Sequence, residues 1–215
     1  LQYKVPGPNR MRDINKALSD IGEIRTQIAA GTSFRGYGPA TIVATGVVGI
    51  ATAIAQSIFR IGPDTAPALF VWSWVGAGIL SAAMVRIEMQ GRSRRHHSGL
   101  ADAMIAQAIE QFLPAAAACL FIPIFLLRFE PRVLWMMPGI WQLFVSLGIF
   151  ASVRTLPRNI IMVAGFYFVS AFASLLLADD SHARAPWLMG VPFLAGQMLM
   201  AAILYFSAGE SDDED

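Results

Sequence analysis

The sequence is poor in charged residues, and it contains one cysteine and three histidines. Lysine, arginine, aspartate and glutamate make up 14% of the 215 residues, whereas soluble domains carry roughly 25%. A water-soluble fold is therefore not expected. The single cysteine, Cys119, cannot form a disulfide within the chain, and a metal site built on cysteines is excluded.

Signatures of catalysis and of cofactor binding are also absent from the sequence. It contains no HExxH, Walker or GxGxxG motif and no pair of carboxylates inside an apolar run. The basic residues are not distributed as on a nucleic-acid-binding face. We therefore expect no enzyme activity, no cofactor and no nucleic-acid partner.

What the sequence does contain is long apolar runs, each near the roughly 20 residues that cross a bilayer as a helix. Spanning β-strands would be about half as long and would alternate in polarity. The pattern predicts an all-α integral membrane protein, with a six-helix transmembrane bundle over residues 37–207 surrounded by the lipid bilayer. The runs are Ala40–Phe59, Ala66–Val85, Gln107–Leu127, Val133–Val153, Asn159–Ala178 and Ala185–Phe206.

The two ends of the chain differ from this apolar centre. Residues 1–36 form a predicted cytoplasmic segment, in which residues 10–30 carry apolar side chains at three- and four-residue spacing, as an amphipathic helix does. That helix either lies on the membrane surface or docks to a partner or second copy. Residues 208–215 are rich in acids and are predicted to be disordered.

The distribution of lysine and arginine predicts the orientation. Under the positive-inside rule, the side with more of these residues is cytoplasmic, so both termini are expected in the cytoplasm. Trp72, Trp74, Trp135 and Trp187 are expected to form an aromatic belt at the outer ends of the helices. The inner set comprises Lys4, Arg10, Arg12, Lys16, Arg25, Arg35, Arg86, Arg92, Arg94, Arg95, Arg154 and Arg158, against Arg60, Arg128, Arg132 and Arg184 outside.

Glu110 is the ionisable residue that lies inside an apolar run. Gln107, Glu110, Gln111 and Pro114 fall on one helical stripe, and a carboxylate facing lipid is costly, so the stripe is expected to face other helices or a wet cavity. At 1.5 Å per residue, Glu110 lies about 5 Å inside the cytoplasmic boundary. Three roles remain open: an ion pair with a cytoplasmic-side arginine, a proton or cation relay or ligand contact, and exposure to headgroup water.

Two further glutamines, Gln142 and Gln197, fall near the middle of the fourth and sixth runs. They are expected to form hydrogen bonds between helices, with substrate binding as the alternative. The first run carries a small residue at every fourth position, which is suited to close packing within the bundle or between two copies. These residues are Thr41, Thr45, Gly49 and Ala53.

A basic loop follows the second run. Its arginines repel a cation, so the adjacent histidines are not expected to bind a metal. By default the loop is a topology signal. It is also a candidate patch for lipid headgroups or for an acidic partner, including the acidic tail of the same chain. Its residues are Arg92, Arg94, Arg95, His96 and His97.

Several short segments resemble a class of uncharacterised bacterial six-span inner-membrane proteins. They are Asp20-Ile21 with Ile24-Arg25, FRGYGPA at 34–40, RSRRHHSGLADAM at 92–104 and EQFLP at 110–114. The resemblance covers nearly the whole chain and implies a bacterial inner (cytoplasmic) membrane. It implies no activity, cofactor or site residue.

Two functions are consistent with these features. The first is a non-enzymatic accessory, sensory or regulatory membrane protein that couples the bundle to a cytoplasmic protein partner or to a second copy. The second is a small proton-coupled transporter that uses Glu110 together with Gln107 and Gln111.

Overall fold

The computed structural model describes residues 38–93, 99–153, 158–178 and 184–209, and every regular element in these ranges is helical. The all-helical prediction is therefore confirmed for this part of the chain. Two 3-10 helices, η1 (Pro131–Met136) and η3 (Arg158–Ile160), precede α5 and α6. The α-helices are α2 (Pro39–Ile58), α3 (Pro67–Ser93), α4 (Gly99–Phe129), α5 (Met137–Ser152), α6 (Ile161–Leu177) and α7 (Ala185–Gly209).

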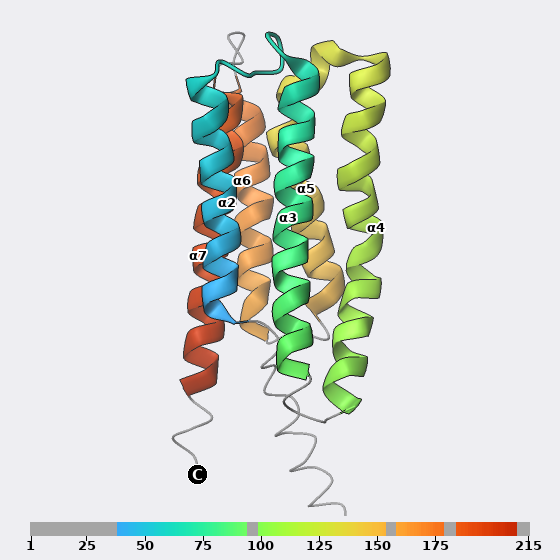
Figure 1. Ribbon diagram of the computed structural model, residues 1–215, viewed down its shortest axis with the longest axis vertical. Helices are drawn as coiled ribbons and strands as arrows, with labels where there is room; N and C mark the ends of the chain where they lie inside the picture. Colours follow the sequence, from blue (N-terminus) through green and yellow to red (C-terminus); the bar gives the residue numbers. More distant parts are fainter. Residues whose placement is uncertain (1–37, 94–98, 154–157, 179–183, 210–215) are drawn as a thin grey trace, which may run out of the picture. The chain divides into compact units, whose positions relative to one another are not determined.

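The six α-helices run alternately up and down, so α2 begins and α7 ends at the same end of the bundle (Figure 1). α2 packs against α7, and α5 packs between α4 and α6. α4 lies at one edge of the bundle, with α3 as its neighbour (Figure 1). Short connections place consecutive antiparallel helices side by side, whereas α2 and α7 pack together although they are far apart in the sequence.

Five helical stretches are long and apolar enough to cross a membrane, which indicates a multi-pass membrane protein. α6 is shorter, at 17 residues, or about 25 Å at 1.5 Å per residue, somewhat less than the roughly 30 Å of a hydrocarbon core. Five of the six predicted spans thus satisfy the length criterion. The predicted helix at 10–30 and residues 210–215 of the predicted disordered tail lie outside the described residues. The first two residues of that tail, Ala208 and Gly209, are helical and end α7.

Glycines bring α2 and α7 into close contact. A methyl group added at Gly49 would lie 2.5 Å from Cδ1 of Phe193, and one added at Gly190 would lie 2.5 Å from Cβ of Ala53. Small residues let two helix backbones approach closely in a membrane. The small-residue face of the first run, which includes Gly49 and Ala53, is therefore used for packing within the chain.

α4 is the least buried of the candidate spans. Only 6% of its most apolar stretch is buried, compared with 50% of the stretch Pro131–Ser152 that includes α5. α4 packs mainly on α5, and the ring of Phe112 in α4 lies against Gly148 in α5. Among the α4 side chains whose burial the structure describes, only Pro123 is thus fully buried.

Candidate functional site

The Glu110 stripe does not face the interior as a unit. Glu110, Gln107 and Pro114 are exposed, and only Gln111 is half-buried. The expectation that this stripe turns inward is wrong for these three residues. The physical reason is that α4 packs through the opposite face, which carries Phe112. Glu110 is the second residue of the candidate span Ile109–Phe129, and it therefore lies near one end of that span.

Gln111 carries an unsatisfied polar atom. Its Oε1 is buried and has no hydrogen-bond partner among the residues that the structure describes. A buried acceptor without a donor typically costs about 1–3 kcal/mol. The polar groups on this part of α4 are therefore not brought together into an internal site.

Gln142 is the centre of a buried network that joins α5, α6 and α7. Its Nε2 donates to Ser174 Oγ at 3.0 Å and to the carbonyl of Leu188 at 2.8 Å, and its Oε1 accepts from Ser170 Oγ at 2.6 Å. Leu188 lies four residues before Pro192, a proline inside α7. Since proline has no N–H, it cannot bond that carbonyl. Gln142 therefore supplies a donor that the helix lacks.

The neighbouring residue, Trp141, supplies a hydrogen-bond donor to α4 in the same way. Its Nε1 donates to the carbonyl of Cys119 at 2.7 Å, and Cys119 lies four residues before Pro123, which is inside α4. The role of Trp141 as an interhelical donor was not predicted from the sequence. The available signal was a proline in an apolar run, which predicts a free carbonyl four residues earlier but not its donor.

Gln197 belongs to a second network, between α2, α6 and α7. Its Nε2 donates to the Tyr167 hydroxyl at 3.1 Å, and its Oε1 accepts from Thr45 Oγ1 at 3.1 Å. The Tyr167 hydroxyl in turn donates to the carbonyl of Phe193 at 3.1 Å. Gln142 and Gln197 thus each bond groups on other helices, in separate networks.

A third network places Trp74 inside the bundle. Trp74 is 5% exposed, and its Nε1 donates to Oε1 of the buried Gln56 at 3.0 Å, which joins α3 to α2. The expected place of Trp74 in an outer aromatic belt is therefore wrong. Trp74 lies on the buried face of α3, whereas Trp72 and Trp187 are 50% and 43% exposed.

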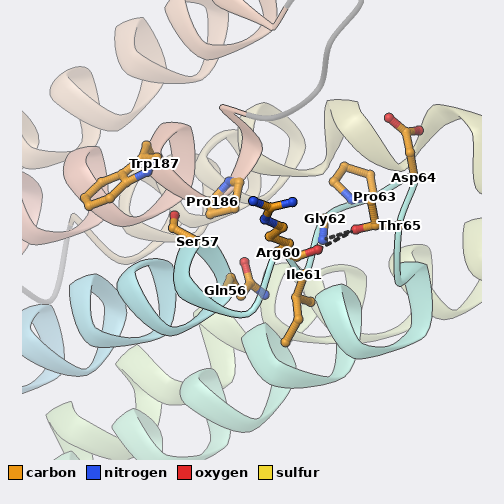
Figure 2. A pocket seen from close by; sticks show the side chains of 10 residues that line it. All are labelled: Gln56, Ser57, Arg60, Ile61, Gly62, Pro63, Asp64, Thr65, Pro186 and Trp187. Atoms are coloured by element: carbon orange, nitrogen blue, oxygen red, sulfur yellow. Dashed lines mark hydrogen bonds between the residues drawn. The ribbon is translucent and has the colours of Figure 1, made fainter.

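A recess of about 420 Å³ lies at the end of the bundle where α2 turns into α3 (Figure 2). Arg60 and Trp187 line it, and the guanidinium of Arg60 lies beside Pro186, whereas the Asp64 carboxylate points away (Figure 2). Arg60 has a φ of 54°, a left-handed conformation that favours glycine. The turn is held by Thr65 Oγ1, which donates to the Arg60 carbonyl at 2.7 Å.

The basic loop can be described only at its start. Arg92 lies in the last turn of α3, whereas Arg94, Arg95, His96 and His97 lie outside the described residues. Among the residues that the structure describes, no cluster of three or more histidine, cysteine, aspartate or glutamate side chains is suited to hold a metal ion.

Comparison with known proteins identifies no relative: no family model, curated protein or solved structure matches the chain. The roles of its residues therefore follow from the geometry alone.

Proposed function

We propose that this chain is a non-enzymatic accessory, sensory or regulatory protein of a bacterial inner membrane. In this proposal a hydrogen-bonded helical bundle anchors residues 1–36 and the loop at 92–97, and these cytoplasmic segments contact a protein partner. A partner-binding role fits the sequence, because the amphipathic helix predicted at 10–30 and the basic loop at 92–97 are both expected on the cytoplasmic side of the membrane.

The observation that carries the proposal is the way the interior polar groups are used. Gln142 and Gln197 have both the nitrogen and the oxygen of their amides engaged with groups on other helices. A carrier places polar groups and broken helices around a substrate near the middle of the membrane. In this chain the amides of Gln142 and Gln197 form hydrogen bonds between helices, and the carboxylate of Glu110 lies on the exposed surface. These features favour an anchor over a carrier.

The proposal includes six crossings with both termini in the cytoplasm. α6 is short, but it connects the lower end of α5 to the upper end of α7, and it packs against both helices (Figure 1). A span shorter than the bilayer is accommodated by local thinning at a modest cost. The excess of lysine and arginine on the side of the termini supports the orientation.

The test is a pair of double substitutions in the helix predicted at 10–30, made in the source organism. Ile21→Asp with Ile24→Asp removes two residues of the apolar stripe, and Asp20→Asn with Glu23→Gln is the matched change on the polar face. We expect the first pair to reproduce the transcript profile of a deletion of the whole gene, and the second pair to resemble the wild type. The amount of protein in the membrane fraction is measured for both, to separate lost contact from lost insertion.

A Glu110→Gln variant separates this proposal from the transporter alternative. If the protein is an accessory protein, this variant keeps the wild-type transcript profile and shows no change in pH-dependent flux in proteoliposomes. A wild-type profile for the Ile21/Ile24 variant, together with a gene-deletion profile for Glu110→Gln, would refute the accessory role and favour the carrier.

A further inference from the structure

The exposed faces of α3 and α4 carry charges of opposite sign near the lower ends of their candidate spans. The same spans also contain Glu88, which is half-buried in α3, and Arg128, which lies at the upper end of α4. Arg86 lies in the span Pro67–Met89 and Glu110 in the span Ile109–Phe129, and both side chains are exposed. Charged side chains inside membrane spans are costly and normally pair or face a polar environment. Within the part of the chain that the structure describes, Glu110 lies on a surface that no other helix covers.

The two charges lie at the same depth. Arg86 is 19 residues from Pro67, the upper end of α3, and Glu110 is 19 residues from Phe129, the upper end of α4. At 1.5 Å per residue, each lies about 28 Å from that end. The two helices stand side by side with their upper ends at similar height (Figure 1).

Along the same two faces, small exposed residues of α3 lie at the same depths as large exposed side chains of α4. Gly76 and Leu120 are each 9 residues from the upper ends of α3 and α4, and Ala83 and Leu113 are each 16 residues from them. A methyl group added at Gly76 would meet nothing within 4 Å, whereas Leu113 is 60% exposed. Small residues opposite large ones let membrane helices pack closely.

We propose that a second copy of this chain docks on the α3–α4 face, with Glu110 of each copy paired with Arg86 of the other. Two copies inserted in the same orientation are related by a two-fold axis along the membrane normal, so residues at equal depth meet. The α3 face of each copy then receives the α4 face of the other, which covers the least buried span of the chain. The proposal does not depend on the role of residues 1–36.

Charge reversal tests the pairing. The Glu110→Arg and Arg86→Glu variants each place like charges at both contacts of a homodimer. We expect each to raise the dimer dissociation constant at least about tenfold, measured by single-molecule photobleaching in lipid vesicles. Arg132→Glu, a matched reversal at an exposed arginine in η1, should leave the constant within about twofold of the wild type.

The decisive measurement is co-expression of the two reversed chains with different affinity tags. A chain with Glu110→Arg and a chain with Arg86→Glu place opposite charges at both contacts only when they bind each other. We expect them to co-purify as a heterodimer although neither forms a homodimer. Rescue in a single chain carrying both reversals, without co-purification of the two separate chains, would show that the pair forms within one chain and would overturn the proposal.

Glycine substitutions give a second test that does not involve charge. Gly76→Leu fills the space proposed for Leu120 of the second copy, so it should abolish the dimer while the monomer folds. Gly165→Leu is the control, because Gly165 in α6 also has nothing within 4 Å of an added methyl group. A monomeric wild-type protein, or a dimer that Gly76→Leu and Gly165→Leu affect equally, would refute docking on this face.

Discussion

At the scale of single residues, two neighbouring side chains of α5 each donate a hydrogen bond to a carbonyl that a proline leaves free, one in α4 and the other in α7. Trp141 donates to the carbonyl freed by Pro123 in α4, and Gln142 donates to the carbonyl freed by Pro192 in α7. In a bilayer, water does not reach such carbonyls, so a neighbouring helix must supply the donor. α5 thus stabilises proline positions in two of the helices that it contacts, α4 and α7.

This arrangement predicts a coupled effect of Trp141 and Pro123. Trp141→Phe keeps the aromatic ring but removes the N–H, so it should lower the free energy of unfolding by about 1 kcal/mol. In a Pro123→Ala background the new backbone N–H can bond the Cys119 carbonyl, so Trp141→Phe should cost roughly half as much or less. The free energies are measured by SDS titration in mixed micelles, followed by circular dichroism.

The control for this cycle is Trp72→Phe, at a tryptophan that is 50% exposed. Its effect should be within about 0.5 kcal/mol of zero and should not change in the Pro123→Ala background. Additive effects of Trp141→Phe and Pro123→Ala would contradict the assignment of Trp141 as the donor that replaces the missing N–H.

At the scale of elements, the end of α2 is the clearest local departure from common sequence preference. Ile61 N–H bonds the carbonyl of Gln56 at 2.8 Å, and Arg60 N–H bonds that of Ser57 at 3.4 Å. This is the hydrogen-bond pattern of a Schellman motif, in which the left-handed position is usually glycine. Here Arg60 occupies that position with a φ of 54°.

Arg60→Gly is therefore expected to stabilise the protein. It removes the left-handed strain of a residue with a Cβ, and the net gain after the entropy of glycine is about 0.5–1 kcal/mol. The same SDS titration measures it. Arg60→Ala is the control, because it removes the charge but keeps the strain, so it should give no such gain. Equal stabilisation by the two variants would assign the effect to the charge rather than to the backbone.

At the scale of the whole molecule, the direction of α6 decides the topology. If α6 crosses the bilayer, its two ends lie on opposite sides. Single cysteines at Asn159 and Arg184, in a Cys119→Ala background, report these sides. We expect a membrane-impermeant maleimide to label position 184 in intact cells, and to label position 159 only after permeabilisation. Asp64→Cys is the reference for the outer side, and labelling of both α6 positions from one side would show that α6 does not cross.

The helical architecture was predictable because a bilayer leaves the backbone no partner except itself. Each apolar run long enough to span therefore had to be a helix. The ends of α2, α5, α6 and α7 agree with the runs within a few residues, whereas α3 and α4 each extend eight residues beyond their runs at the lower end. Gln142 and Gln197 could be recognised as polar groups at membrane depth for the same reason. Their partners, such as Ser170 and Tyr167, could not, since helical periodicity does not say which helices are neighbours.

The sequence by itself determined that the described residues form long apolar helices, which residues share a face and which side chains cannot remain unpaired in lipid. Only the tertiary structure decided which face each helix buries. It turned Glu110 outward and Trp74 inward, because α4 packs through Phe112 on α5 and α3 packs through Trp74 against Gln56 of α2. The periodicity of a helix fixes the angles between side chains, whereas the choice of buried face depends on neighbours that are distant in sequence.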